Sequence, residues 1–459
     1  MNSYQGKRVL IIGAARQGMA LARYLAGKGA RVTLNDKQSA GQLQQKVDQL
    51  SSIGIAWVLG EHPLSLLEDI DLVCVSGGVP LTLPIVSEAL KRGIPVSNDS
   101  QIFMETVKAP VVGITGSSGK TTTTTLFGRM AEIGLPAPHK AWVGGNIGNP
   151  LIEYVDVIDS QDLVIQEFSS FQLELMTISP HLAAILNITP NHLDRHANMA
   201  EYIRAKSSII AYQKAGDIAV LNRDDQGSWN FHPQVRGSLV SFGKQEADTD
   251  SPQVYLEHGF VLAKSGGRTT ALLDSRLVKL RGEHNLMHVL AACALAYALD
   301  FTPEAIATGV EGFTGVKHRL ELVRELNGVS WINDSIATTP ERTLAALHSF
   351  DEPLILLLGG RDKNLPWETL SREILRRVDH VVVFGEAAEK IMTAIGQPGG
   401  ESRLQTIVQK LTMLEALEET LRIATPGDVV LLSPGCTSYD AFKDFEERGD
   451  TFTDWVNGL

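Results

Sequence analysis

The sequence contains little cysteine. Among its 459 residues there are only three cysteines, Cys74, Cys293 and Cys436, and no two of them stand in a C-x-x-C spacing. Scattered cysteines in apolar or loop contexts are typical of a reducing compartment, and they argue against a disulfide framework and a zinc site. We therefore expect three buried thiols.

Apolar runs long enough to enter a membrane are also missing. The run at residues 9–15 is ended by Arg16 before it reaches the length of a signal-peptide core. The longest later run, residues 286–301, contains His288 and falls short of the about 20 apolar residues that cross a bilayer. The sequence therefore predicts no membrane insertion and a cytoplasmic location.

Basic charge is in deficit, with 41 lysines and arginines against 53 acidic residues and a net charge of −12. Binding to a nucleic-acid backbone needs a concentrated basic surface, so we expect no nucleic-acid partner. The chain is several times the usual domain length of about 150 residues. Its hydrophobic content of 44% is ordinary for a globular protein, and we expect a monomer with several cores.

Short apolar runs alternate with helical periodicity along the chain, which is typical of α/β units with parallel sheets and crossover helices. We predict three domains: a Rossmann-like N-terminal domain (1–108), a central P-loop ATPase-like domain (109–312) and a Rossmann-like C-terminal domain (313–459). The main strands are expected at residues 9–13, 31–34, 72–75, 111–115, 163–166, 182–186, 329–332, 354–358, 380–384 and 429–432, with a helix at 284–299.

The strongest local signal is an apolar strand, a loop of small residues and then Gly119-Lys120-Thr121 at a predicted helix start. Such a loop lets backbone N–H groups face phosphate oxygens, and the helix N-terminus adds partial positive charge. Lys120 is expected at the β and γ phosphates, and the Thr121 hydroxyl on Mg²⁺. The strict G-x-x-x-x-G-K-T spacing is not met, because Ile114 occupies the first glycine position. The residues expected to contact ATP here are Gly116, Ser117, Ser118, Gly119, Lys120, Thr121 and Thr122.

Together with seven further segments, this loop resembles the Mur ligase family, and its MurD branch in particular. The family loop reads T-G-x-x-G-K-T, present here as Thr115-Gly-Ser-Ser-Gly-Lys-Thr121. The other segments follow in the family's order: Gly144-Gly-Asn-Ile-Gly148, Glu167-Phe-Ser-Ser-Phe-Gln-Leu-Glu174, Asn187-Ile-Thr-Pro-Asn-His-Leu-Asp-Arg195, Gly282-Glu-His-Asn285, Lys317-His-Arg-Leu-Glu321, Asn333-Asp-Ser335 and Leu431-Leu-Ser-Pro434. The resemblance implies a nucleotide-sugar domain, an ATPase domain and a C-terminal domain that closes over them.

The resemblance also implies a reaction in peptidoglycan precursor synthesis. ATP phosphorylates the carboxylate of UDP-N-acetylmuramoyl-L-alanine, and the amine of an incoming glutamate displaces phosphate through a tetrahedral intermediate. Mg²⁺ and lysine would stabilise the charged oxygens during the transfer. The cofactors implied are ATP and Mg²⁺, and the implied catalytic residues are Lys120, His192 and Lys206.

By the same resemblance, Glu167 and His192 hold magnesium beside Thr121, and Lys206 matches a family lysine that CO₂ carbamylates. A carbamate is an anionic oxygen ligand, which suits a metal site that a free ammonium would repel. Taken alone, Glu167 would be a strand-end carboxylate and Lys206 a solvated helix lysine. The spacing of His192 and His196 would also allow zinc, but no third histidine or Glu-x-x-His neighbour supports it.

The resemblance assigns further residues to the two smaller ligands. A lysine and hydroxyls suit the two carboxylates of a glutamate. The residues implied for adenine, ribose and γ-phosphate are Asn285, Arg319 and Asp334, and those for glutamate are Thr338, Lys363, Ser438 and Phe445.

The N-terminal segment Gly13-Ala-Ala-Arg-Gln-Gly18 resembles G-x-G-x-x-G, but Ala15 replaces the second glycine. A dinucleotide pyrophosphate would approach closely at that position, so the substitution weakens an NAD interpretation. Asp36, after the second predicted strand, suits the uracil or ribose of UDP. The residues expected to bind the UDP substrate are Arg16, Gln17, Asp36, Lys37, Gly78, Asn146 and Ser169.

Other functions remain as alternatives. A folylpolyglutamate-type ligase also joins glutamate to an ATP-activated carboxylate, but such enzymes lack an N-terminal UDP-binding unit. A dinucleotide-dependent oxidoreductase or a non-catalytic nucleotide-binding regulator would not need the phosphate loop together with Glu167, His192 and Lys206.

One segment departs from the family. The family's N-D-S-K-A-T-N is Asn333-Asp-Ser-Ile-Ala-Thr-Thr339 here, so Ile336 stands in place of a lysine. We expect another cation to replace that charge, with Arg361 the nearest candidate by motif because a guanidinium can clamp a carboxylate. D-glutamate is the expected acceptor, and L-glutamate remains the alternative.

Overall fold

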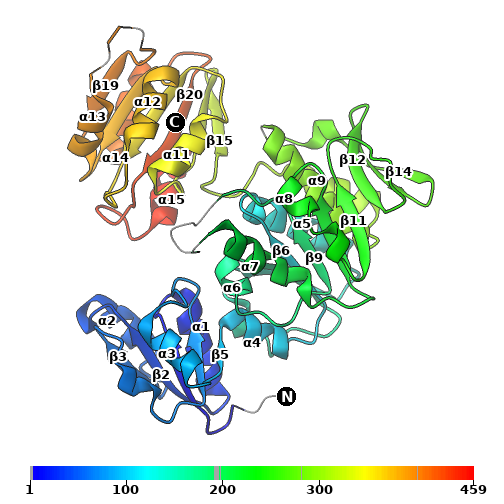
Figure 1. Cartoon of the computed structure of the whole chain (residues 1–459). Helices are drawn as coiled ribbons and strands as arrows, with labels where there is room; N and C mark the ends of the chain where they lie inside the picture. Colours follow the sequence, from blue (N-terminus) through cyan, green and yellow to red (C-terminus); the bar gives the residue numbers. More distant parts are fainter. Residues whose placement is uncertain (1–3, 191–195, 197, 281, 398, 401) are drawn as a thin grey trace. The chain divides into compact units, whose positions relative to one another are not determined.

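A computed structural model of the chain describes residues 4–190, 196, 198–280, 282–397, 399–400 and 402–459. These residues form two compact units. Unit 1 holds the described residues up to Lys279 together with Glu283–Phe313, and unit 2 holds Leu280, Gly282 and the described part of Thr314–Leu459. Unit 1 contains two sheets and unit 2 contains one (Figure 1). No helix in the described ranges is both long and apolar enough to cross a membrane.

The first sheet has five parallel strands in the order β3-β2-β1-β4-β5. Its central strand reads Arg-Val-Leu-Ile-Ile and is buried after its first residue, because parallel strands covered on both faces need apolar side chains throughout. The elements are β1 (Arg8–Ile12), α1 (Arg16–Gly27), β2 (Arg31–Asp36), α2 (Ala40–Gln49), β3 (Ala56–Leu59), η1 (Leu64–Leu67), β4 (Leu72–Val75), α3 (Pro84–Lys91), β5 (Val96–Ser97) and α4 (Asp99–Thr106).

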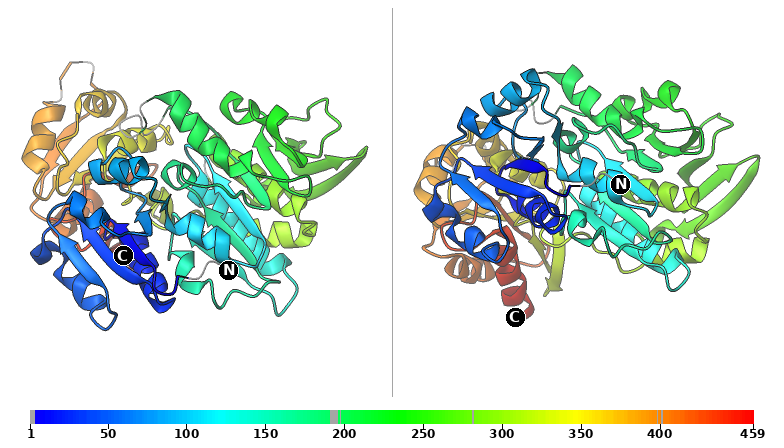
Figure 2. Two further views of the ribbon diagram at one scale, coloured as in Figure 1. Left: turned by 60° about the horizontal axis from the view of Figure 1, so that its bottom comes forward. Right: turned by 90° about the horizontal axis from the view of Figure 1, so that it is seen from below.

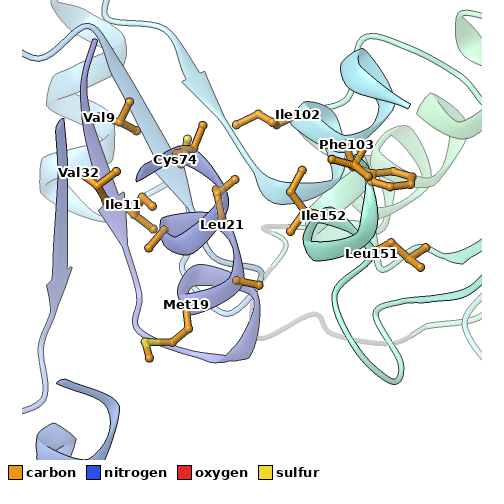
Figure 3. Packing of buried hydrophobic residues seen from close by; sticks show 14 of the residues in the cluster. Val9, Ile11, Met19, Leu21, Val32, Cys74, Ile102, Phe103, Leu151 and Ile152 are labelled. Carbon is orange, nitrogen blue, oxygen red and sulfur yellow. The ribbon is translucent and has the colours of Figure 1, made fainter. Parts of the chain in front are cut away.

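An apolar cluster joins this sheet to the rest of unit 1 (Figure 3). Ile11 on β1 and Leu21 on α1 belong to it, as do Ile102 on α4 and Ile152 on η2 (Leu151–Tyr154). Each of these four side chains is at most 2% exposed. Their burial removes a contiguous apolar surface from water, which is the dominant stabilising contribution in a core.

The second sheet has nine strands in the order β14-β13-β12-β11-β10-β9-β6-β8-β7. Strand β6 lies between β9 and β8 and is parallel to both. Its elements, besides η2, are β6 (Val111–Thr115), α5 (Lys120–Gly134), β7 (Ala141–Gly145), β8 (Leu163–Glu167), α6 (Ser170–Leu173), β9 (Leu182–Ile185), α7 (Met199–Ala211), β10 (Ile218–Asn222), α8 (Gln226–Trp229), η3 (His232–Gln234), β11 (Ser238–Phe242), β12 (Gln253–Glu257), β13 (Phe260–Ser265), β14 (Arg268–Asp274), η4 (Ser275–Leu277), α9 (Glu283–Ala298) and α10 (Pro303–Val310).

One edge of this sheet differs from the all-parallel arrangement that the sequence predicts. Strands β12, β13 and β14 pair in antiparallel fashion and form the sheet edge seen in Figures 1 and 2. The turns between them are short, and His258, Gly259, Gly266 and Gly267 all have positive φ. Two-residue hairpin turns need such residues, so Gly266-Gly267 was the sequence signal for this hairpin.

The third sheet, in unit 2, has six strands in the order β15-β16-β20-β17-β18-β19. Only β15 runs antiparallel to its neighbour among the described strand pairs. Its elements are β15 (Glu321–Leu326), β16 (Val329–Asn333), α11 (Pro340–Leu347), β17 (Leu354–Gly359), α12 (Glu368–Arg377), β18 (His380–Phe384), α13 (Ala388–Ile395), β19 (Thr406–Gln409), α14 (Met413–Ile423), β20 (Val429–Gly435) and α15 (Phe445–Asn457). The fold is α/β with three sheets, as the sequence predicts.

Candidate active site

The predicted phosphate loop joins the end of β6 to the start of α5. Gly119 precedes the helix with a φ of +75°, and a Cβ there would lie 2.0 Å from Nε2 of His288 on α9. Both the left-handed backbone and the close ring exclude a side chain at this position. The strand, loop and helix therefore follow each other as predicted.

Side chains from the start of α5 and from the ends of β7 and β8 meet at this loop. Nζ of Lys120 donates to the carbonyl of Gly116 at 2.9 Å, and Oγ1 of Thr121 donates to Oε2 of Glu167 at 2.9 Å. Glu167 ends β8, is 1% exposed and accepts from Nδ2 of Asn146 at 2.7 Å. Carboxylate and hydroxyl oxygens suit Mg²⁺, which usually keeps water and phosphate oxygens in its remaining positions. The residues present therefore fit a magnesium ion.

Lys206 on α7 is buried next to the loop. Its side chain is 1% exposed, and Nζ lies 2.8 Å from the carbonyl oxygen of Gly116 and 3.2 Å from Oγ1 of Thr115. Burial lowers the pKa of Lys206 well below its usual value; repulsion from Lys120 adds to this, and Glu167 opposes it. The shift favours the uncharged form of the Lys206 amine.

The two histidines considered for metal binding have different outcomes. His192 lies outside the described residues. His196 is buried, with Nε2 placed 2.9 Å from Oγ of Ser170 and its ring stacked on Phe171 at 5.2 Å. These contacts are those of a packed core histidine and do not favour the zinc alternative.

The residues predicted for the UDP substrate lie in two places. Arg16, Gln17, Asp36, Lys37 and Gly78 follow the carboxyl ends of β1, β2 and β4, which is where ligands bind in open α/β sheets. The carboxylate of Asp36 accepts from the backbone N–H of Ala14 at 2.7 Å and of Gln38 at 2.9 Å, so it also orders the turn after β1.

The other two predicted UDP contacts lie at the second sheet. Asn146 holds Glu167, as described above. Ser169 caps α6 by accepting from the backbone N–H of Gln172 at 3.3 Å, so its hydroxyl has a structural partner.

The residues predicted for adenine, ribose and γ-phosphate are divided between the units. Asn285 lies in the first turn of α9 in unit 1, and its Oδ1 is 3.1 Å from Nδ1 of His288. Arg319 and Asp334 belong to unit 2. Asp334 is 5% exposed and accepts from Oγ of Ser433 at 2.8 Å. Burial raises its pKa to about 7, against the hydrogen bonds and the nearby Arg319.

The predicted glutamate residues lie at what we name the carboxyl edge of unit 2, formed by loops 334–339, 360–366 and 436–444. Strands β16, β20 and β17 are parallel neighbours, so these loops converge. Nζ of Lys363 donates to Oγ1 of Thr338 at 3.3 Å. Ser438 is 2% exposed, and the carbonyl of Phe445 accepts from Oγ of Ser335 at 2.8 Å.

Arg448 holds this edge together and was missed from the sequence. It is fully buried and donates to the hydroxyl and carbonyl of Ser335, at 3.0 and 2.8 Å, and to the carbonyl of Cys436 at 3.2 Å. Burial lowers its pKa to about 10. One guanidinium therefore ties the loop after β16 to the loop after β20. No sequence signal distinguishes such an arginine from an exposed one.

Arg361, the predicted replacement cation, has an acidic partner in the structure. Its guanidinium donates Nε–H and Nη2–H to the two carboxylate oxygens of Glu386, each at 2.8 Å. Arg342, which was not predicted, donates from Nη1 to the carbonyl of Ile336 at 3.0 Å. The proline at position 340 was the available signal, because it predicts a helix start that places Arg342 beside this loop.

Family models match three successive segments of the chain. Residues 7–98 match the Mur ligase MurD-like N-terminal domain, residues 114–296 the Mur ligase middle domain, and residues 318–436 the Mur ligase glutamate ligase domain. Among solved structures, the chain is similar to a UDP-N-acetylmuramate-alanine ligase, MurC, from Thermotoga maritima. The TM-score is 0.57 at 19% identity, over 98% of this chain and 99% of that one. MurF from Acinetobacter baumannii gives a TM-score of 0.56 at 17% identity, over 100% and 92%.

Two relatives are similar over the whole length. A UDP-N-acetylmuramoylalanine–D-glutamate ligase from Symbiobacterium thermophilum is 40% identical, over 99% of this chain and 98% of its own. One from Pelotomaculum thermopropionicum is 39% identical, over 100% and 99%. With the three domain matches and the phosphate loop, this similarity shows that the chain belongs to the Mur ligase family, in the branch of the UDP-N-acetylmuramoylalanine–D-glutamate ligases.

Proposed function

We propose that the protein uses ATP to join D-glutamate to UDP-N-acetylmuramoyl-L-alanine in the synthesis of peptidoglycan precursors. The observation that carries this proposal is the identity of 40% with a ligase of that name over 99% of the chain. The group of Lys120, Thr121, Glu167 and Lys206 around the loop supports the ATP-dependent step, with Glu167 and Lys206 buried.

The chemistry has two steps. The γ-phosphoryl group passes from ATP to the substrate carboxylate, ADP leaves, and the acyl phosphate makes the carbonyl carbon electrophilic. The glutamate amine then attacks this carbon, phosphate leaves and an amide forms. Lys120 and the loop N–H groups would stabilise the negative oxygens during transfer. Thr121 and Glu167, together with His192 as the resemblance implies, would hold a magnesium ion, which would neutralise charge at the phosphates when bound.

In this proposal each of the three domains binds its own ligand. The domain at 1–108 binds the UDP substrate through Arg16, Gln17, Asp36, Lys37 and Gly78, with Asn146 and Ser169 contributing from the centre. The domain at 109–312 binds ATP through the loop and Asn285. The domain at 313–459 contributes Arg319 and Asp334 to the nucleotide and binds glutamate through Thr338, Lys363, Ser438 and Phe445. The nucleotide substrates fit a cytoplasmic enzyme, and we assign it as a monomer.

We further propose that CO₂ carbamylates Lys206. The amine adds to the carbon of CO₂ and loses a proton, which turns a cation into an anionic oxygen ligand. The support is the burial of Nζ and the lowered pKa of its ammonium, because only the neutral amine can attack CO₂.

Phosphate release tests the function directly. Purified protein with ATP, Mg²⁺ and UDP-N-acetylmuramoyl-L-alanine is given single amino acids, and D-glutamate should release phosphate fastest. Faster release with L-glutamate would change the stereochemical assignment. Release with a reduced folate and glutamate, but not with the UDP substrate, would replace the proposal with a folylpolyglutamate-type ligase.

A further inference from the structure

Helix α5 links the phosphate loop to the end of unit 1. Its first residue is Lys120 of the loop, and the helix packs on α10. Gly309 of α10 lies so close to α5 that a Cβ there would stand 2.9 Å from Cα of Met130. The rings of Phe127 on α5 and Phe301 before α10 stack with their centroids 6.2 Å apart. Close packing of this kind makes the two helices one rigid body.

Arg129, in the second half of α5, holds the end of α10. Its Nε donates to the carbonyl of Gly309 at 3.1 Å, and its Nη2 donates to the carbonyl of Glu311 at 2.9 Å. The last carbonyls of a helix have no partner within the helix and carry partial negative charge, so a guanidinium is favourable there. Arg129 therefore fixes the point at which α10 ends.

The chain leaves unit 1 directly after this contact, through residues 311–316, which we name the exit segment. Gly312 turns the backbone with a φ of +69°, and Phe313 then buries its ring against Arg129, whose Cζ is 5.5 Å from the ring centroid. A cation over an aromatic face adds attraction to this packing. Phe313 is the last residue of unit 1, and the main part of unit 2 begins at Thr314. Arg129 thus ties the start of the exit segment to the helix of the phosphate loop.

Arg319 follows the exit segment after only a short length of chain. It is the sixth residue after Phe313, and six residues span at most about 20 Å. The actual reach is shorter, because the backbone N–H of Arg319 donates to the carbonyl of Val316 at 3.1 Å and closes a turn. A fixed Phe313 therefore limits the positions that Arg319 can take relative to the phosphate loop.

We propose that Arg129 is a positioning residue for Arg319, because it holds the exit segment on the helix that carries the phosphate loop. This inference rests on the proposed function, in which Arg319 contacts the nucleotide bound at that loop. Arg129 itself touches no substrate and acts only on the segment from which unit 2 extends. Without it the tether between the loop and Arg319 would be longer and freer, and placing Arg319 would cost more entropy.

Steady-state kinetics of Arg129→Met, alone and combined with Arg319→Met, test the inference. Arg129→Met alone should lower kcat/KM for ATP about 10-fold, because Arg319 is held less often in its place. In the Arg319→Met background the same change should cost less than about twofold, because the residue through which Arg129 acts is gone. Affinity for the UDP substrate, measured by calorimetry, should stay within about twofold. Arg236→Met, at an exposed arginine before β11 in the same unit, is the matched control and should behave as wild type.

Hydrogen exchange of the full-length protein locates the effect. In Arg129→Met the amides of the exit segment should exchange about 10-fold faster, since its anchor is lost, while those of α9 should not change. Arg129→Lys keeps the charge but not the forked geometry, so it should give an intermediate increase, and it serves if Arg129→Met does not fold. Phe313→Leu removes the ring and should give a smaller increase than Arg129→Met.

Three results would overturn the inference. They are unchanged exchange of the exit segment in a folded Arg129→Met protein, an equal loss of kcat/KM with and without Arg319, and a loss of UDP-substrate affinity as large as the loss for ATP. Failure of the proposed function looks different, because the wild-type protein itself would then release no phosphate with D-glutamate, whereas the exchange of the exit segment would still respond to Arg129→Met.

Discussion

The phosphate loop of unit 1 and the carboxyl edge of unit 2 differ in how their charged side chains are compensated. At the loop, Lys120 and Lys206 are held by backbone carbonyls, and Thr121 is held by the carboxylate of Glu167. At the carboxyl edge, Arg342 and Lys363 repel each other. The charged groups at the loop are therefore held by contacts within unit 1, whereas two cations at the edge of unit 2 raise each other's energy.

The same contrast appears in how the two regions are encoded. Four consecutive loop residues and the helix start that follows them build the phosphate site, so a short motif describes it. The carboxyl edge draws on loops separated by about a hundred residues, such as Ser335 and Cys436, and a buried arginine joins them. Substitutions at the loop should thus slow phosphoryl transfer, whereas substitutions at the edge should weaken ligand binding or lower the stability of unit 2.

The largest effect is expected from Lys120→Ala. Phosphate release should fall about 1000-fold, because a cation that stabilises the transferring phosphoryl group is removed. Binding of the UDP substrate, measured by calorimetry, should persist, since its predicted contacts follow β1, β2 and β4. Lys140→Ala, an exposed lysine before β7, is the control. A folded Lys120→Ala protein that no longer binds the UDP substrate would contradict the division between the two sites.

Lys206→Ala should reduce activity about 100-fold, in the range seen when a group that supports a metal site is lost. If the wild-type lysine is carbamylated, removal of bicarbonate should lower wild-type activity, and small carboxylates should partly restore the variant. Carbon-13 NMR with labelled bicarbonate should show the carbamate carbon. Lys214→Ala, an exposed lysine just after α7, should behave as wild type, and full activity in bicarbonate-free buffer would refute carbamylation.

At the carboxyl edge, Arg448→Met should lower the free energy of unfolding by about 3 kcal/mol, because it leaves several buried acceptors without a donor. Thermal unfolding and proteolysis should locate the loss in unit 2. Arg361→Met, at the exposed pair with Glu386, is the matched arginine control and should produce no measurable change. Equal destabilisation by the two variants would show that Arg448 does not hold the loops.

Much of the fold could be predicted, because central parallel strands are continuous apolar runs. The predicted strand at 111–115 coincides with β6, and 429–432 lies within β20. The strands β3 and β19 were not predicted; they lie at sheet edges and neither has a fully buried residue. An edge strand lacks the apolar run by which a central strand is recognised. The interior strands β10 and β11 were also missed, although both have buried apolar residues.

The site was predictable where chemistry requires a fixed spacing. Gly119, Lys120 and Thr121 follow one another, so the motif locates them together. The roles of Arg342 and Arg448 were not predicted, because the sequence does not show whether an arginine side chain is buried, ion-paired or hydrogen-bonded to a preceding loop. Their positions follow from the convergence of β16, β17 and β20, which is a property of the sheet rather than of any one segment.

The smallest effect per pH unit concerns the pH dependence of stability at the carboxyl edge. Burial raises the pKa of Asp334 from 3.8 to about 7. Below both values the carboxyl is protonated in the folded and the unfolded chain. Between them the unfolded chain releases the proton while the folded chain keeps it, so the free energy of unfolding falls as pH rises. Above about 7 both states are ionised, and the contribution of Asp334 no longer changes.

Asp334→Asn should remove this slope, which amounts to at most about 1.4 kcal/mol per pH unit for one proton. Denaturant unfolding of both proteins from pH 4 to pH 8 measures the difference. The wild type should lose stability relative to Asp334→Asn up to about pH 7 and then run parallel to it. Asp351→Asn, in an exposed loop of the same unit, is the control and should follow the wild type. Parallel curves for wild type and Asp334→Asn throughout would mean that Arg319 and Arg342 keep the carboxyl ionised. The positive charges at the carboxyl edge would then be balanced by a carboxylate, as those at the phosphate loop are balanced by Glu167, and the contrast between the two regions would fail.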